Sequence, residues 1–242
     1  MRIPRFYQNT PISVDNILAL DDDAVGHVAR VLRMRCGESI ILFNGDGNEY
    51  HAELVEVEKR RVNAKILSST QPNRISPLQI DIGQSISRGE RMDYAIQKAT
   101  ELGMNSMTPL LSERCEVRLK ADRLAKKQQQ WQQLSISACE QSLRTTTPVI
   151  QAATSLEAWV NNCQAELKLV LHHHCAEPLD TRLQPQSIAL LIGPEGGLSD
   201  AEVEHAKKAG FQSVVFGPRV LRTETAPVAA LSILQYLWGD LG

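Results

Sequence analysis

Two kinds of hydrophobic pattern divide the chain. Up to about Ser69, short apolar runs alternate with polar residues at the period of half-buried strands. In SIILFNGDGNEYHAELVEVE, two such runs flank NGDGN, whose Gly and Asn residues accept positive φ angles, and this favours a β-hairpin. RRVNAKILS predicts a further strand. We therefore expect a small β-barrel in the first part of the chain.

One segment of this first region has helical spacing instead. DAVGHVARVLRM predicts one short helix, with Val28, Val31 and Leu32 facing inward. The later stretch STQPNRISP holds two prolines and several turn formers, and it predicts a linker. The predicted domains are therefore residues 1–72 and residues 73–242.

From Leu78 onward, strand and helix patterns alternate. LKLVLHHH and SIALLIG have the near-continuous apolar character of strands covered on both faces. Capping boxes from Ser87 to Glu90 and from Ser199 to Glu202 predict two helix starts. The final helix, APVAALSILQYLW, is too apolar to be fully solvated, so we expect the core or a partner to cover part of it. Alternation of this kind predicts an α/β domain with a mainly parallel sheet.

Composition narrows the class of protein. The 242 residues are 43% hydrophobic and 22% charged, which is typical of a folded globular chain. No apolar run approaches the roughly 18 residues of a membrane span, and the first ten residues lack the apolar core of a signal peptide. The five cysteines are scattered and form no C-x-x-C motif, which favours buried free thiols in a reducing cytoplasm over disulfides or a zinc site.

The net charge of −2 hides an uneven distribution. Residues 73–150 carry more Lys and Arg than Asp and Glu, and RCEVRLKADRLAKK is the most basic part of that region. A solvated helix face and a surface that contacts RNA would both give this pattern. Charge alone leaves the two interpretations open.

Two glycine turns are the strongest candidates for a binding site. IGPEGGLSD begins at Ile192 and FGPRVLRTETAP begins at Phe216, and each follows an apolar run. Ligands of open α/β sheets bind at such strand ends. A phosphate loop is excluded because no Lys follows Gly196 or Gly197, and Glu195 would repel a phosphate. Two interpretations remain from the residues alone: backbone contacts to an adenosine-type ligand, or tight turns that serve packing.

LLIGPEGGLSDAE and FGPRVLRTETAPVAAL together resemble the C-terminal signature of the RsmE-type rRNA methyltransferases, which belong to the SPOUT class. HVARVLRMRCGE, RMDYAIQKATELG, LLSERCEV and ACEQSLR also match that family, so the resemblance covers nearly the whole chain. It implies a SPOUT-type parallel sheet with a C-terminal trefoil knot, preceded by a small PUA-like β-barrel that binds RNA. It further implies a homodimer that methylates N3 of one specific uridine in small-subunit (16S) ribosomal RNA.

The same resemblance implies that three loops enclose one S-adenosylmethionine molecule. Apolar side chains would hold the adenine ring, and backbone groups would read its edge. The residues expected to bind this cofactor are Leu171, His172, Ile192, Gly193, Glu195, Gly196, Gly197, Gly217, Val220, Leu221 and Arg222.

Methyl transfer from a sulfonium to a uracil nitrogen requires in-line geometry and loss of the N3 proton. Arg222 and Glu224 are the candidate catalytic residues, and Arg222 would stabilise the developing negative charge. Glu224 could equally cap the last helix, because carboxylates favour helix N-termini. Both roles of Glu224 remain open at the level of sequence.

Four arginines are candidates for contact with RNA phosphates, although each could equally be a solvated surface residue: Arg33, Arg35, Arg88 and Arg91. The run His172–His174 predicts no metal site, because adjacent residues on a strand alternate faces. An alternative function is a non-catalytic RNA-binding ribosome-assembly factor on the same fold. The intact glycine turns argue against that alternative, since a pure RNA binder gains nothing from them.

Overall fold

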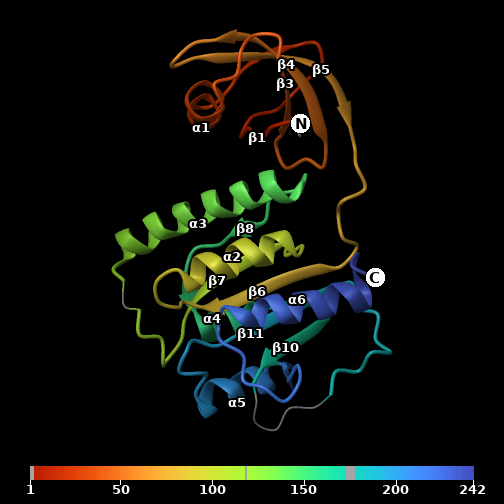
Figure 1. The fold of residues 1–242 in the computed structure, drawn as a ribbon. Coiled ribbons are helices and arrows are strands. Elements are labelled where there is room, and N and C mark those ends of the chain that lie inside the picture. Colours follow the sequence, from red (N-terminus) through yellow and green to blue (C-terminus); the bar gives the residue numbers. More distant parts are fainter. Residues whose placement is uncertain (1–2, 118, 173–177) are drawn as a thin grey trace. The chain divides into compact units, whose positions relative to one another are not determined.

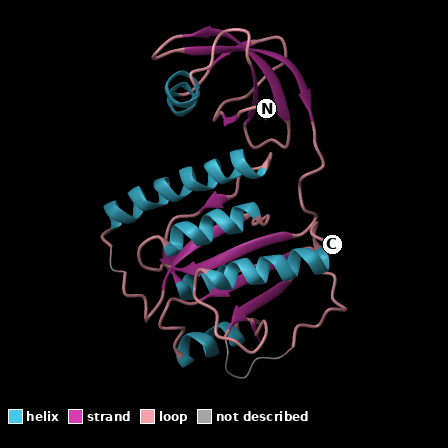
Figure 2. Cartoon of the chain, in the orientation of Figure 1, coloured by secondary structure: helices cyan, strands magenta, loops and turns pink. Residues whose placement is uncertain are grey.

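The fold is known from a computed structural model, drawn in Figure 1, which describes residues 3–117, 119–172 and 178–242. Figure 2 shows the same chain by secondary structure, with strands and helices in both halves of the sequence. Within the described residues, no helix is both long enough and apolar enough to cross a membrane.

The chain divides into two compact units. The first unit holds the chain up to Ile75 together with Cys139–Thr147, and the second holds Ser76–Ala138 and Pro148–Gly242. The predicted linker lies where the first unit gives way to the second. The structure also assigns the nine residues after Ala138 to the first unit. The predicted domains, which divide the chain at a single point, do not include such a segment.

The first unit is built on a five-stranded sheet in the order β1-β3-β4-β5-β2. Its strands are β1 (Arg5–Tyr7), β2 (Ile17–Ala19), β3 (Ser39–Phe43), β4 (Glu49–Val57) and β5 (Val62–Thr70). The predicted hairpin is confirmed: β3 pairs antiparallel with β4, and Gly45 and Gly47 in the turn both have a φ of 93°. Leu42, Leu54 and Ile66 of the sheet are fully buried and form part of its core.

The short helix of this unit differs from the prediction. It consists of α1 (Asp22–Gly26) followed directly by a π-helix, η1 (His27–Leu32). Val28 is fully buried as predicted, but Val31 and Leu32 are 65% and 47% exposed, so their predicted inward orientation was wrong. A π-helix has more residues per turn than an α-helix, and a pattern read at 3.6 residues per turn therefore loses its phase there.

Arg5 holds the segment after Ala138 in the first unit. Its side chain is 2% exposed and forms a 3.0 Å ion pair with Glu49. The Arg5 guanidinium also donates hydrogen bonds to the backbone oxygens of Cys139 and Arg144, at 3.0 and 3.1 Å. Burying a guanidinium is costly unless it is paired and hydrogen-bonded, so Arg5 can be buried only together with these partners. A strand at the start of the chain is thereby joined to residues more than 130 positions later.

The second unit has a parallel sheet in the order β12-β10-β11-β6-β7-β8, with β9 also paired to β7. Every strand pair in it is parallel, which confirms the predicted α/β class. The strands are β6 (Gln79–Ser85), β7 (Ser106–Leu111), β8 (Val149–Ile150), β9 (Thr154–Ser155), β10 (Leu167–Leu171), β11 (Ser187–Ile192) and β12 (Gln212–Val214). The sequence pattern did not predict β8 and β9, because two residues are too few to establish a period.

Helices cover both faces of this sheet (Figures 1 and 2). They are α2 (Arg91–Glu101), α3 (Ala121–Ser142), α4 (Leu156–Asn162), α5 (Asp200–Lys208) and α6 (Thr225–Trp238). Residues of α2, α3 and α6, among them Ile96, Trp131 and Leu231, form one core cluster with β6. Residues of α4 and α5, among them Val160 and Val203, form another with β7, β10 and β11. The burial of β10 and β11 between these layers explains their continuous apolar runs.

Of the two predicted capping boxes, one is confirmed and one was wrong. The side chain of Ser199 accepts from the Glu202 backbone N–H, and the Glu202 carboxylate accepts from that of Ser199. The helix after Ser87 instead begins at Arg91, and its N-cap residue, Glu90, makes no capping bond with its side chain. Gly89, with a φ of 60°, turns the chain before the helix starts, so Ser87 lies too far from it to cap.

The second unit has a tryptophan in its core, whereas the cysteines of the chain, predicted to be buried free thiols, differ in burial. Trp131 is 4% exposed in the core and donates a 2.9 Å hydrogen bond to Asp93, as expected of a packing anchor. The cysteines that the structure describes are free, but only Cys139 is buried, and Cys36 is exposed, so the expectation that the thiols are buried was wrong for Cys36. Cys175 lies outside the described residues.

Candidate functional site

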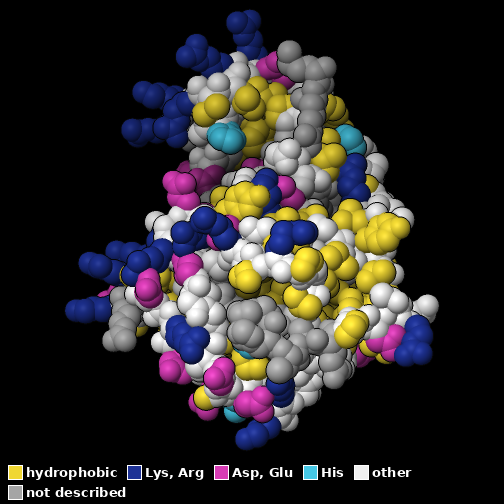
Figure 3. Space-filling view, turned by 60° about the horizontal axis from the view of Figure 1, so that its bottom comes forward, with side chains coloured by type: hydrophobic (Ala, Val, Ile, Leu, Met, Phe, Trp, Pro, Cys, Tyr) yellow, Lys and Arg dark blue, Asp and Glu magenta, His cyan; other side chains and the backbone are white. Residues whose placement is uncertain are grey.

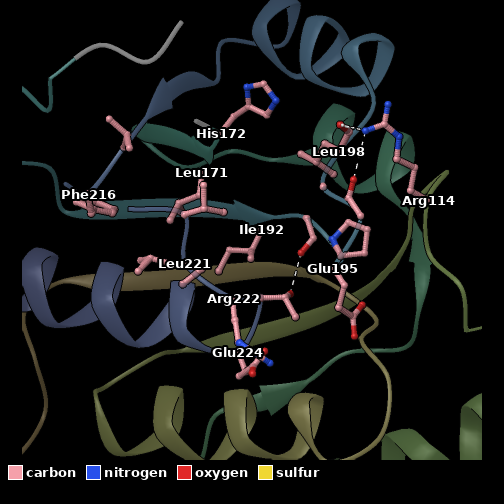
Figure 4. Close-up of a pocket in the computed structure, with 18 of the residues that line it drawn as sticks. Arg114, Leu171, His172, Ile192, Glu195, Leu198, Phe216, Leu221, Arg222 and Glu224 are labelled. Atoms are coloured by element: carbon pink, nitrogen blue, oxygen red, sulfur yellow. Dashed lines mark hydrogen bonds between the residues drawn. The ribbon is translucent and has the colours of Figure 1, made fainter. Parts of the chain in front are cut away.

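A cavity of about 720 Å³ opens in the second unit at the carboxyl ends of β10, β11 and β12. Its walls are the end of β10, the glycine turn that follows β11, and the segment between β12 and α6 (Figure 4). Open parallel sheets bind ligands at this edge, and sites for small molecules usually measure roughly 300–1,000 Å³. The two glycine turns of the sequence therefore do face one space.

All the predicted cofactor-binding residues except Gly217 line this cavity. They are Leu171, His172, Ile192, Gly193, Glu195, Gly196, Gly197, Val220, Leu221 and Arg222. Gly217 itself has a φ of 81° and turns the chain between Phe216 and Arg219, whose side chains do line the cavity. Sequence reasoning did not select Phe216, Arg219 or Thr223, although all three belong to the quoted stretch FGPRVLRTETAP.

The cavity has an apolar end and a charged end. Figure 4 shows Phe216, Leu171, Ile192 and Leu221 together in one part of it, all with apolar side chains. Charged side chains approach it elsewhere: Arg114, Glu195, Arg222 and Glu224. Such a site suits a ligand with a flat ring at one end and charged groups at the other, because each part then meets matching chemistry.

The turn after β11 depends on its glycines. Gly197 has a φ of 69°, which side-chain-bearing residues rarely adopt, and its N–H donates to the Pro194 oxygen at 2.9 Å. A Cβ atom at Gly193 would lie 3.0 Å from the backbone nitrogen of Leu198. The turn is therefore too tight at Gly193 to admit a side chain without shifting.

Arg114 braces this turn from outside it. Its guanidinium donates hydrogen bonds to the backbone oxygens of Gly196 and Leu198, at 3.3 and 3.2 Å (Figure 4). Arg114 belongs to the segment between β7 and α3, far from the turn in sequence. No local signal in LLSERCEV indicated this contact, so sequence reasoning missed it.

Glu195 is anchored to the start of α2. Its carboxylate accepts hydrogen bonds from the Arg88 backbone N–H at 3.0 Å and from the Arg91 guanidinium at 2.7 Å. Burial alone would raise the pKa of Glu195, but these hydrogen bonds and the Arg91 charge outweigh it, and the pKa is lowered. The carboxylate is therefore ionised at neutral pH, and Arg91 neutralises it beside the cavity.

Glu224 stands at the N-cap position of α6, but its side chain makes no capping hydrogen bond. Glu224 therefore has the position that the alternative role requires, at the start of the helix, but it does not cap the helix through a side-chain hydrogen bond. One carboxylate oxygen lies 4.0 Å from Arg91 Nε, and the other is buried with no hydrogen-bond partner among the described residues. An unpartnered buried acceptor is costly, and here it belongs to a residue that lines the cavity. The fold itself thus leaves one acceptor oxygen of this cavity-lining residue unused.

The structure separates the four arginines predicted to contact RNA. Arg88 forms an ion pair with Glu116, and Arg91 lines the cavity and pairs with Glu195. Arg33 and Arg35 are exposed in the first unit. Glu38 accepts a hydrogen bond from the Arg35 backbone N–H, and the described residues include no ion pair of Arg33.

A metal centre finds no support in the part of the chain that the structure describes. His172 lines the cavity, whereas His173 and His174 lie outside the described residues. No group of three or more His, Cys, Asp or Glu side chains within the described ranges is arranged to hold a metal ion.

Two family models match the chain. A model described as an RNA methyltransferase domain matches residues 74–235, and one described as an RNA methyltransferase PUA domain matches residues 20–67. The first match contains the cavity and both glycine turns, and the second lies in the first unit.

Curated relatives match over nearly their whole length. The ribosomal RNA small subunit methyltransferase E of Buchnera aphidicola is 35% identical over 242 residues, covering 99% of this chain and 98% of its own. The protein of the same name from Bacillus subtilis is 31% identical over 228 residues, covering 90% and 89%.

Solved structures agree with the fold and were obtained with a ligand. A putative methyltransferase from Legionella pneumophila in complex with the bound cofactor SAM is 43% identical, with a TM-score of 0.96. The ribosomal RNA small subunit methyltransferase E of Neisseria gonorrhoeae bound to S-adenosyl methionine is 42% identical, with a TM-score of 0.94. Both matches cover 100% of this chain and 100% of the other.

Proposed function

The chain belongs to the RNA methyltransferase family, and from this premise we propose that it transfers the methyl group of S-adenosylmethionine to N3 of one specific uridine in 16S ribosomal RNA. At the coarser level it is a small-subunit rRNA methyltransferase that uses S-adenosylmethionine, like its relatives. The observation that carries the proposal is the cavity that both glycine turns share. We place the enzyme in the cytoplasm, where its substrate is assembled.

The residues of the cavity fit the cofactor. Leu171, Ile192, Phe216 and Leu221 offer an apolar slot for the adenine ring, and the glycine turn presents backbone groups close to it. When bound, S-adenosylmethionine supplies an electrophilic methyl group on a positively charged sulfur. Arginines and carboxylates both line the cavity, and Arg91 already pairs with Glu195.

The remaining chemistry falls to Glu224 and Arg222. Uracil N3 carries a proton that must leave before the nitrogen can attack, and the unpartnered oxygen of Glu224 is the acceptor offered for it. Arg222 lines the same cavity, and the described residues include no ion pair that would neutralise it. Its guanidinium would stabilise the negative charge that develops on the uracil oxygens.

Purified protein incubated with S-adenosylmethionine and rRNA tests the proposal. We expect mass spectrometry to find one added methyl group, on N3 of a single uridine, in naked 16S rRNA or in assembled small subunits from a strain that lacks the enzyme. Methylation of another base would contradict the proposed target. Calorimetry that detects no S-adenosylmethionine binding would favour the alternative, a non-catalytic ribosome-assembly factor.

Basic side chains offer a surface for the RNA. Figure 3 shows Lys and Arg side chains at the surface, interspersed with Asp and Glu. In the second unit, α3 carries Arg123, Lys126 and Lys127 within two turns of one another, and none of them has an ion pair among the described residues. In the first unit, Arg33 and Arg35 are exposed at the end of η1. These cations can neutralise phosphates.

We expect Arg33→Ala to weaken RNA binding and methylation while S-adenosylmethionine binding stays at the wild-type value. Arg33 lies outside the unit that contains the cavity, and among the described residues it has no carboxylate partner that the substitution would strand. Loss of one phosphate contact should reduce the log–log salt dependence of RNA affinity by about 0.7 to 0.9. Filter-binding at several salt concentrations measures this slope. Lys208→Ala, which removes an exposed cation from α5, is the control, and an unchanged slope for Arg33→Ala would contradict the assignment.

We also expect a homodimer. One face of α6 is buried in the core through Leu231 and Leu234, yet Ile233 and Tyr236 of the same helix are 36% and 66% exposed. A second copy would remove this apolar surface from water. Light scattering at micromolar concentration should give twice the chain mass of 26.9 kDa. A monomer mass would refute the dimer, and Tyr236→Asp is expected to dissociate it.

A further inference from the structure

A buried relay of two hydrogen bonds joins three segments of the second unit. Gln84, at the end of β6, is fully buried, and its amide nitrogen donates to the Thr223 hydroxyl oxygen at 2.9 Å. The Thr223 hydroxyl donates in turn to the backbone oxygen of Gly193 at 2.8 Å (Figure 4). The relay thus connects the central strand of the sheet, the segment before α6 and the glycine turn.

The chemistry of the three groups fixes the direction of the relay. The Gly193 carbonyl can only accept a hydrogen bond, so the Thr223 hydroxyl must donate to it. The hydroxyl has a single hydrogen, so its oxygen must accept from Gln84, and the amide nitrogen of Gln84 must face it. Turning the Gln84 amide over would place its oxygen against the Thr223 oxygen, and neither atom would then have a hydrogen to share.

This arrangement leaves the other end of Gln84 unsatisfied. Its Oε1 atom is buried and has no hydrogen-bond partner among the described residues. An unpartnered buried oxygen lowers the stability of the fold, and an apolar side chain at Gln84 would avoid that cost. The relay is therefore better explained by what it positions than by what it adds to stability.

Thr223 is the most buried residue of the segment 217–224, in which Leu221 and Glu224 are half-buried. Thr223 itself is 7% exposed, whereas Val220 is 77% exposed and Arg219 is also exposed. Its neighbours in sequence, Arg222 and Glu224, are the candidate catalytic residues. Fixing Thr223 to Gly193 therefore fixes the distance between the glycine turn and the segment that carries both catalytic groups.

We propose that Thr223 and Gln84 are positioning residues, which hold the glycine turn and the Arg222–Glu224 segment in the register that methyl transfer requires. The inference rests on the proposed function and extends it to two side chains that do not react. Thr223 lines the cavity, but its hydroxyl hydrogen is committed to Gly193. Gln84 acts one step further away, through Thr223.

Thr223→Val tests the proposal, because it removes the hydroxyl and leaves the Gly193 carbonyl oxygen unpaired with little change in shape. We expect S-adenosylmethionine affinity, measured by calorimetry, to fall about tenfold, and kcat to fall further than that. Thr223→Ser retains the hydroxyl and should recover both values to within about threefold. Ser135→Ala is the matched control: Ser135 is fully buried in α3 and shares a 3.1 Å hydrogen bond with Thr100, away from the cavity.

Two outcomes would overturn the proposal. One is wild-type cofactor affinity and kcat in a folded Thr223→Val protein. The other is an equal loss in Ser135→Ala, which would indicate general destabilisation. If Thr223→Val does not fold, Gln84→Leu takes its place, since it removes the unsatisfied oxygen; it should melt no lower than wild type and still lose kcat. A wild-type protein that binds S-adenosylmethionine but methylates no RNA would contradict the proposed function. The relay would still be tested by the S-adenosylmethionine affinity of the Thr223→Val protein.

Discussion

Glu224→Gln is expected to lower kcat by about 10²- to 10⁴-fold, the usual contribution of a general base. The amide keeps the shape of the carboxylate but cannot take the N3 proton. Its NH₂ group is itself a hydrogen-bond donor, so it cannot accept a hydrogen bond from the N3–H group. S-adenosylmethionine affinity should change much less, because the apolar end of the cavity and the glycine turn are untouched. Single-turnover methylation of rRNA, together with calorimetry for the cofactor, separates these two effects.

A matched control exists for this substitution. Glu116 also pairs with an arginine, Arg88, but its side chain is 58% exposed and does not line the cavity. Glu116→Gln should therefore leave kcat close to the wild-type value. If Glu224→Gln retains full kcat, Glu224 is not the base. If it loses cofactor affinity as strongly as kcat, its role is to bind the cofactor.

Gly197→Val is expected to weaken S-adenosylmethionine binding by more than about 100-fold. Gly197 lines the cavity with a φ of 69°, and a Cβ atom placed on it would meet no other atom within 4 Å, so we expect the Val side chain to extend into the space that the ligand requires. The left-handed backbone adds a strain of roughly 1–2 kcal/mol, which calorimetric unfolding would detect as a lower melting temperature.

Gly210→Val separates the effect of backbone strain on stability from the effect of lost ligand space on cofactor binding. Gly210 has a φ of 91°, a Cβ placed on it would also meet no atom within 4 Å, and it follows α5 away from the cavity. Both variants should lose similar stability, but only Gly197→Val should lose the cofactor. Equal cofactor affinity in the two proteins would refute the placement of the ligand at this turn. Gly196→Val should have a smaller effect than Gly197→Val, since its Cβ would meet the Arg114 side chain at an ordinary 3.4 Å.

Local patterns were sufficient for most elements of the fold. The apolar runs of β10 and β11, the hairpin around Gly45 and Gly47, and the capping box at Ser199 each depend on interactions within a few residues, or on burial from both faces. The prediction failed where the backbone departs from the geometry that the pattern assumes. The π-helix after Gly26 shifted Val31 and Leu32 to the surface, and the turn at Gly89 delayed the start of α2 to Arg91.

The sequence by itself determined the two glycine turns and the apolar strands that lead into them, because turn geometry and strand burial are encoded in adjacent residues. Only the tertiary structure decided which distant groups meet these turns. Arg114 donates to the carbonyls of the turn after β11, Arg91 lies between two carboxylates, and Gln84 reaches the turn through its relay. Parallel strands are joined by long crossovers, so neighbours in the sheet come from positions far apart in the chain. No pattern within a single segment can specify such pairs, since their partners are chosen by packing.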